Sequence, residues 1–233
     1  SIEATIGQVL SLAPDRTALF GYAHVPWMKK HQQMIPDEAL PDIHARFTQS
    51  QLAAGLLNAG GLQSIGFDHF ARPTDSLALA AAAGRLRRNF QGYTDDRADM
   101  LIGLGASAIG QLPQGYVQNI TPTGDYQKSV LAGGGATTRG FALSPADRLH
   151  GFAIEALLCR FALRREELRQ FGAAGETLFD AAGIIAATDP DGLTRAHADC
   201  FSVTERGRPF VRAIAARFDT YLATGAARHS LAV

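Results

Sequence analysis

The chain has 233 residues, 46% of them hydrophobic and 19% charged, so it can bury the core of one large domain or of two small ones. Its 22 basic and 22 acidic residues balance, which excludes a global attraction to nucleic acid, to an anionic membrane or to an acidic substrate. Any charged ligand must therefore be bound by local groups.

No part of the chain approaches the roughly 18 consecutive apolar residues that a membrane span needs. The first ten residues lack the basic segment of a secretion signal and contain Glu3, so we expect a cytoplasmic protein without a membrane partner. Only two cysteines are present, Cys159 and Cys200, which excludes a disulfide framework and a C-x-x-C metal pair. We expect both to be buried as small apolar residues.

The first third of the chain predicts a helix followed by a strand, a second helix and a second strand. Ser1 is a suitable N-cap for a helix that ends before Pro14. Residues 17–24 (TALFGYAH) predict a buried strand, residues 43–60 a helix, and residues 64–70 (SIGFDHF) another strand. Because strand-helix-strand units form right-handed parallel pairs, we expect an α/β layer or barrel.

Two unusual segments follow. A helix that starts after Asp75 ends at Gly84, and the connection after it holds residues 88–94 (RNFQGYT), which match neither the strand period nor the helix period. Residues 100–110 (MLIGLGASAIG) are apolar and contain three glycines, which is typical of a strand end that another group approaches closely. We therefore expect one loop and several strand ends to converge.

Residues 133–140 (GGGATTRG) form a glycine-rich, low-complexity segment. We expect it to be flexible and to separate two domains, 1–135 and 136–233, of which the second is mainly helical. Near the C-terminus, a strand at 200–203 is followed by a helix with Thr204 as its N-cap. This order predicts a strand-turn-helix unit of the winged-helix kind.

Histidines lie at the ends of both predicted strands, at His24 and His69. Ligands of parallel α/β proteins bind at the carboxyl ends of strands, so the two side chains are candidates for one shared pocket. The alternative is that each imidazole makes an ordinary hydrogen bond at a strand end. The Asp68-His69 step has no further ligands beside it, so we expect no metal site.

Several arginines lie in the same region, and a guanidinium group suits a carboxylate or a phosphate. Arg85 and Arg87 follow the end of a predicted helix and are expected to be solvated, which leaves Arg88 as the candidate. The basic face of the last helix suits nucleic acid, as in winged-helix proteins, but the nearby Glu205 and Asp219 and the neutral total argue against such a partner.

Five segments resemble one enzyme family and occur in its order along nearly the whole chain. They are GYAHVPW (21–27), IGFDHFARPTDSLALA (65–80), RNFQGYT (88–94), GLGASAIG (103–110) and VTERGRPFVRAIAARFDTYL (203–222). Together they resemble oxygen-independent coproporphyrinogen III oxidase, also called coproporphyrinogen III dehydrogenase, a radical S-adenosylmethionine family of haem (porphyrin) biosynthesis.

The resemblance implies an oxidoreductase that turns two propionates of coproporphyrinogen III into vinyl groups, with loss of CO2, to give protoporphyrinogen IX. It implies an external electron donor and acceptor, two S-adenosylmethionine molecules, and a 4Fe-4S cluster held by a C-x3-C-x2-C motif. The implied fold is α/β: the C-terminal part of a partial (β/α) radical S-adenosylmethionine barrel, followed by a small, mainly helical, winged-helix-like domain.

By the same resemblance, six residues belong to the site. The cofactor-binding residues are Phe20, Ala23 and Ile109, the catalytic residue on the substrate side is Gln91, and the substrate-binding residues are Arg88 and Tyr93.

The chain departs from the family in its cysteines, because neither Cys159 nor Cys200 belongs to a C-x3-C-x2-C motif. We therefore expect only the C-terminal half of such an enzyme, which holds no cofactor firmly, is inactive alone, and self-associates through exposed strand edges. The alternative is a non-catalytic module that binds porphyrin or haem, with His24 or His69 as axial ligand.

Overall fold

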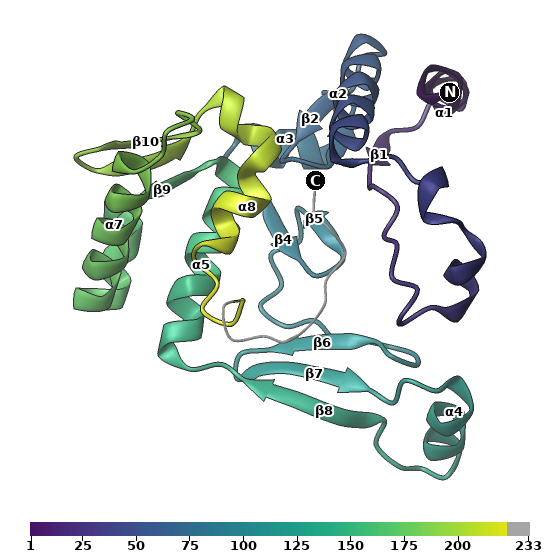
Figure 1. Ribbon diagram of the computed structural model, residues 1–233. Helices are drawn as coiled ribbons and strands as arrows, with labels where there is room; N and C mark the ends of the chain where they lie inside the picture. Colours follow the sequence, from purple (N-terminus) through teal and green to yellow (C-terminus); the bar gives the residue numbers. More distant parts are fainter. Residues whose placement is uncertain (223–233) are drawn as a thin grey trace. The chain divides into compact units, whose positions relative to one another are not determined.

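The computed structural model describes residues 1–222 (Figure 1). Its contacts divide the chain into two compact units. The first contains Ser1–Asp95 and the segment from His150 onward, and the second is Asp96–Leu149. The boundary predicted at residue 135 falls inside the second unit and stays a prediction.

The first unit contains the two helices that the sequence predicts, and both have a capping side chain. Helix α1 (Ile2–Ser11) has Ser1 as its N-cap, and α2 (Ile43–Ala59) has Asp42, whose carboxylate accepts a hydrogen bond from the Ala45 backbone N–H at 2.7 Å. Between them lie β1 (Arg16–Ala18) and the short 3-10 helices η1 (Lys30–Met34) and η2 (Asp37–Ala39).

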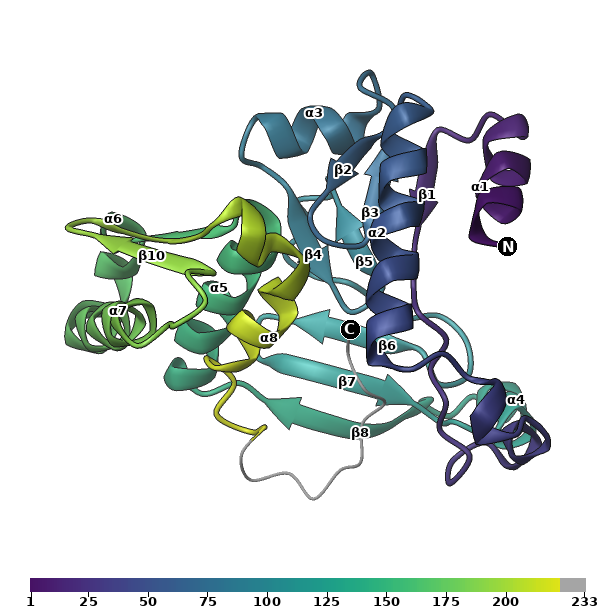
Figure 2. The ribbon, with the colours of Figure 1, turned by 45° about the horizontal axis from the view of Figure 1, so that its top comes forward.

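A small sheet with the strand order β1-β3-β2 packs against α2. Strand β2 is Gln63–Ile65 and β3 is His69–Ala71. Helix α2 lies along one face of this sheet (Figure 2), and buried Ala53 and Leu57 of α2 share a core with Phe70 of β3 and Ile6 of α1. The core exists because these apolar side chains leave water together.

The predicted parallel strand pair is wrong. Residues 64–70 fold back on themselves as a hairpin, with a turn that includes Gly66 at φ 60°, so that β3 pairs antiparallel with both β2 and β1. The predicted strand over 17–24 ends at Ala18, which faces His69 at the very start of β3. One more backbone hydrogen bond, from the Leu19 N–H to the Asp68 carbonyl at 2.8 Å, follows that pair.

Residues 88–94 are also not an irregular loop, because they form most of a hairpin. Strand β4 (Arg87–Asn89) pairs antiparallel with β5 (Gly92–Thr94). The Asn89 side chain accepts hydrogen bonds from the backbone N–H groups of Gln91 and Gly92, which closes the turn. Strands of three residues are too short to show an alternating pattern in the sequence.

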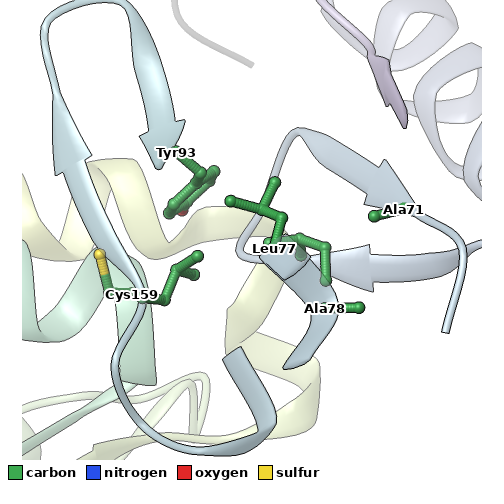
Figure 3. Packing of buried hydrophobic residues seen from close by; sticks show 7 residues of the cluster. Ala71, Leu77, Ala78, Tyr93 and Cys159 are labelled. Atoms are coloured by element: carbon green, nitrogen blue, oxygen red, sulfur yellow. The ribbon is translucent and has the colours of Figure 1, made fainter. Parts of the chain in front are cut away.

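The hairpin contributes to a second core of the first unit. Tyr93 of β5 lies beside Leu77 and Ala78 of α3 (Ser76–Ala82) and near Cys159 of α5 (Pro145–Arg160), as Figure 3 shows. The expectation that Cys159 is buried is confirmed, whereas Cys200 is only half-buried.

The later part of the first unit contains a sheet with the order β10-β11-β9 and helices beside it. The predicted strand at 200–203 is confirmed as β11, and Thr204 caps the helical segment that follows, accepting a hydrogen bond from the Gly207 backbone N–H. The elements are β9 (Ala162–Arg164), α6 (Arg165–Leu168), η3 (Arg169–Phe171), α7 (Gly172–Ala187), β10 (Thr194–His197), β11 (Cys200–Val203), η4 (Glu205–Phe210) and α8 (Val211–Ala216).

The second unit is an antiparallel sheet with a helix. Its elements are β6 (Ile109–Leu112), β7 (Gly115–Asn119), α4 (Thr123–Leu131) and β8 (Thr137–Ala142), and the strand order is β6-β7-β8. The expectation that residues 133–140 form a flexible junction is therefore partly wrong, because β8 starts at Thr137 and pairs with β7. Of residues 100–110, the final two belong to β6, and Leu101 forms an isolated bridge with Gln111.

No helix within residues 1–222 has the length and apolar character of a membrane span.

The burial of Leu57 predicts a large effect on stability. Leu57 is 0% exposed, so Leu57→Ala is expected to lower the free energy of unfolding by about 2 to 5 kcal/mol through the lost transfer energy and the cavity left behind. Leu12→Ala is the matched control, because Leu12 is 81% exposed and should change that energy by less than about 0.5 kcal/mol. Urea denaturation of both variants measures the difference, and equal losses would contradict the packing described here.

Candidate functional site

A buried carboxylate organises the polar groups at the start of β3. Asp68 is 6% exposed, and its Oδ1 lies 2.6 Å from Nδ1 of the neighbouring His69. Its two oxygens also accept hydrogen bonds from Nη1 and Nη2 of Arg88, at 3.3 and 3.2 Å. The guanidinium of Arg88 thus contacts both oxygens of one carboxylate in a bidentate pair, which fixes the orientation of the two side chains.

Two aromatic rings hold Arg88 in this position. Its guanidinium carbon lies 4.4 Å from the ring centre of Tyr93 and 4.8 Å from that of Phe67. Arg88 of β4 stands directly opposite Tyr93 of β5 in the hairpin, which brings the cation over the ring face. Arg88 therefore already has a carboxylate and two rings as partners.

Tyr93 is buried and anchored at its hydroxyl. The O–H donates to the Leu158 carbonyl at 2.6 Å, and burial raises the pKa of the phenol well above its ordinary value. The ring fits because residue 66 is glycine: a Cβ built there would lie 2.0 Å from the Tyr93 hydroxyl oxygen. Tyr93 is thus part of the core beneath the site.

His69 lies at the edge of this cluster. Its ring packs edge-on against Tyr93 at 5.1 Å between centroids and against Phe20 at 5.8 Å. Its Nε2 approaches Gly92 so closely that a Cβ there would lie 2.8 Å away. Within residues 1–222 this nitrogen makes no hydrogen bond, whereas Nδ1 is bound to Asp68.

The structure brings four of the six predicted site residues to this place. Phe20 and Tyr93 contact the His69 ring, Arg88 reaches it through Asp68, and Gln91 precedes Gly92 in the turn of the hairpin. Phe20 is 61% exposed and Gln91 is also exposed, so both are open to a ligand. The group as a whole, Phe20, Asp68, His69, Arg88, Gln91 and Tyr93, is called the His69 cluster below.

Ala23 lies in an exposed segment whose backbone makes two hydrogen bonds with the Gln32 side chain. The Gln32 amide donates to the Ala23 carbonyl at 3.1 Å and accepts from the Val25 N–H at 2.6 Å. The adjacent His24 has its Nε2 3.4 Å from Asp37, while its Nδ1 is buried without a hydrogen-bond partner in the described structure. No signal in the sequence singles out Gln32, since it stands in a polar run.

Ile109, the sixth predicted residue, belongs to the second unit. It opens β6, is half-buried, and pairs with Gln118 of β7. A Cβ on Gly103 would lie 2.7 Å from the Ile109 carbonyl oxygen, so the predicted close backbone approach does occur in this glycine-rich segment.

The cysteines do not suit an iron-sulfur cluster. A cluster ligand must be a thiolate, but burial raises the pKa of the Cys159 thiol to about 12. Among the described residues there is also no group of three or more His, Cys, Asp or Glu side chains that could hold a metal ion.

Comparison with known proteins finds close relatives. The chain is 50% identical over 233 residues to oxygen-independent coproporphyrinogen III oxidase of Paracoccus denitrificans, and covers 51% of that protein. It is 39% identical over 226 residues to the protein of the same name from Thermostichus vulcanus, covering 95% of this chain and 69% of the relative. The chain thus spans about half the length of the first of these relatives. No family model matches it.

A solved structure agrees in fold. Coproporphyrinogen III oxidase (HemN) from Escherichia coli, described as a radical SAM enzyme, superposes with a TM-score of 0.87 at 36% identity, over 95% of this chain and 51% of that one. The α/β arrangement of the chain is therefore the arrangement of part of that enzyme.

The Arg88–Asp68 pair is expected to be strongly coupled. The two side chains are only 19% and 7% exposed, so Asp68→Asn and Arg88→Met should each lower stability by about 2 to 4 kcal/mol, and the double variant by less than their sum. In a double-mutant cycle, the coupling energy should exceed about 1 kcal/mol. The Arg208–Glu205 pair, with side chains 48% and 82% exposed, is the control and should give less than about 0.5 kcal/mol. Similar coupling in both pairs would contradict this view.

Tyr93→Phe is expected to destabilise the protein in a pH-dependent way. At neutral pH the lost bond to Leu158 should lower the free energy of unfolding by about 1 kcal/mol. The folded pKa is raised, so above pH 10 only the unfolded chain ionises this tyrosine, and the wild type loses stability that the variant does not. The difference between the two proteins should therefore shrink as pH rises past 10. Tyr22→Phe, at an exposed position, should show neither effect, and a difference independent of pH would exclude the titration of Tyr93.

Proposed function

Because the chain belongs to the oxygen-independent coproporphyrinogen III oxidase family, we propose that it is the C-terminal half of an enzyme that converts coproporphyrinogen III into protoporphyrinogen IX. In this reaction two propionates each lose a hydrogen atom, an electron and CO2 and become vinyl groups. The observation that carries the proposal is the 50% identity to a relative of that name over all 233 residues of this chain.

The fold proposed for this half is the C-terminal part of a partial (β/α) barrel followed by a small winged-helix-like domain. The β10-β11 hairpin, which packs against helix α7, supports the second part, because a winged helix has a hairpin next to a helical unit. The strand-helix-strand order of β1, α2 and β2 supports the first part, although in this chain β3 lies between the two strands.

The iron-sulfur cluster of such an enzyme does not fit the residues of this chain. The buried Cys159 thiol and the half-buried Cys200 cannot provide three thiolates. We therefore assign cluster binding to the remainder of the parent enzyme, and no chemical step to it here. The isolated chain should accordingly be inactive.

S-adenosylmethionine fits the surface around Phe20 and Ala23 better. The exposed Phe20 ring can stack on an adenine. Beside the backbone to which Gln32 is hydrogen-bonded, His24 has a buried Nδ1 without a partner in the described structure. When bound in the whole enzyme, this cofactor supplies the radical that takes a hydrogen atom from the substrate. We propose that Phe20 and Ala23 contact it and that Gln32 orients the Ala23 segment. For Ile109, the proposal that it contacts S-adenosylmethionine rests on the family resemblance alone.

On the substrate side we propose that Gln91 touches the tetrapyrrole from the tip of the β4–β5 hairpin. Tyr93 supports this hairpin from the core beneath. Arg88 has both arms of its guanidinium on Asp68, so we assign it a positioning role and do not expect it to bind a propionate directly.

A second candidate function is a non-catalytic haem-binding module, which the unpartnered Nε2 of His69 favours as an axial ligand. A haem titration followed at the Soret band separates the two functions. A shift that disappears in the double variant His24→Ala and His69→Ala would support the module, whereas a flat titration would remove it.

A chimera tests the proposed function. The aligned region of the Paracoccus denitrificans relative is replaced by this chain, and the product is assayed anaerobically with coproporphyrinogen III, S-adenosylmethionine and a reductant. We expect protoporphyrin IX fluorescence after oxidation of the product. Gln91→Ala should lower turnover by about 100-fold through misplaced substrate, whereas Gln51→Ala, at an exposed position of α2, should not change it.

Two outcomes would count against the proposal. A folded chimera that holds its cluster but makes no product would remove the proposed function. Turnover by the 233-residue chain alone, after reconstitution with iron and sulfide, would show that the chain holds a cluster that its cysteines do not suit.

A further inference from the structure

We infer that Arg212 of α8 binds a carboxylate of the ligand held beside the His69 cluster, an inference that rests on the proposed function. The carboxylate belongs either to a propionate of the tetrapyrrole or to the amino-acid part of S-adenosylmethionine. Recognition by a guanidinium is the same in both cases, and the experiment below distinguishes them.

The first argument is that Arg212 is a cation without a carboxylate partner. It is exposed, and within residues 1–222 its guanidinium forms no ion pair and no hydrogen bond. The neighbouring arginines differ, because Arg88 is bonded to Asp68, and Arg208, in the same segment as Arg212, lies 2.7 Å from Glu205. The N–H donors of Arg212 are therefore open to a ligand as far as the described residues are concerned.

The second argument is the place of Arg212 beside the cluster. Its guanidinium carbon lies 5.7 Å from the ring centre of Phe67, and that of Arg88 lies 4.8 Å from the centre of the same ring. Phe67 directly precedes Asp68 in the chain. Two guanidinium groups, one paired with a carboxylate and one unpaired, thus meet at the edge of the His69 cluster.

Packing just before α8 holds this segment in place. The rings of Phe210 and Phe47 stack with their centres 5.5 Å apart and their planes only 11° from parallel. Phe47 belongs to α2, which shares a core with Phe70 of β3, and Val211 at the start of α8 is fully buried. Arg212 therefore follows an anchored residue, and its position near the start of β3 is set by the fold.

The third argument is the charge. A guanidinium stays protonated throughout the ordinary pH range, so this cation depends on no titration. Arg88 already balances the carboxylate of Asp68, which leaves the charge of Arg212 uncompensated by that pair. Contact with the Phe67 ring uses none of the N–H donors of Arg212, and its planar fork matches the two oxygens of a carboxylate.

The experiment titrates the full chain with coproporphyrin III and with S-adenosylmethionine, and follows binding by fluorescence and calorimetry. Matched ligands without the carboxylate are the tetramethyl ester of coproporphyrin III and 5′-methylthioadenosine. The test variant Arg212→Gln removes the charge, and Arg212→Lys keeps the charge but not the fork. Arg217→Gln is the matched control, because Arg217 directly follows α8 and is also exposed, but contacts no aromatic ring within residues 1–222.

We expect Arg212→Gln to weaken the binding of one of the two acids by about tenfold, with little change for its carboxylate-free partner, because a charge-assisted pair is lost. Arg212→Lys should restore part of the affinity, and Arg217→Gln should leave it unchanged. The acid affected identifies the source of the carboxylate. In the wild-type chain, that acid should also shift the ¹⁵Nε signal of Arg212, a readout that does not depend on how well a variant folds.

The inference is overturned if the wild type binds the acids and Arg212→Gln binds both with unchanged affinity, or if acid and ester lose affinity equally. It is also overturned if Arg217→Gln weakens the acid as much as Arg212→Gln does, because a diffuse effect of charge gives that result. The proposed function would survive each of these outcomes. If the wild type binds neither acid, the inference falls as well, while activity of the chimera still decides the proposed function.

Discussion

The buried carboxylate of Asp68 is the constraint on which the site depends. A carboxylate taken out of water costs several kcal/mol unless charged and hydrogen-bonding partners replace the solvent. Here the partners are His69 in the next position and Arg88, which comes from a hairpin twenty residues later. Satisfying this one group therefore ties the turn before β3 to the β4–β5 hairpin and fixes the orientation of the imidazole between them.

Glycines make this arrangement sterically possible. Gly66 leaves room for the Tyr93 ring, and Gly92 leaves room for Nε2 of His69. A group of the cluster thus occupies the space that a side chain would take at each glycine. Gly92 also has φ 143°, a conformation that favours glycine and lets the hairpin turn tightly. The same two glycines thus shape the turns and allow the His69 and Tyr93 rings to pack closely.

The site could be predicted only in part. The family resemblance brought forward Phe20, Arg88, Gln91 and Tyr93, and the structure places them around His69. It could not indicate that Arg88 already has a carboxylate partner, because Asp68 and Arg88 meet only through the pairing of distant segments. Gln32 forms a hydrogen bond with the Ala23 carbonyl, but nothing in the sequence indicates this role. In a run of polar residues, the sequence does not distinguish a buried glutamine from an exposed one.

The sequence by itself determined where two helical segments start, because Ser1 and Thr204 each cap the segment that follows through a backbone N–H within three residues. It also indicated the apolar stretches that form the cores. Only the tertiary structure decided the strand pairing. Residues 64–70 were predicted as one strand in a parallel pair, yet they turn at Gly66 and pair antiparallel on both sides. Pairing partners are chosen by contacts between residues far apart in the chain, and strands of three residues carry too little local pattern to reveal them.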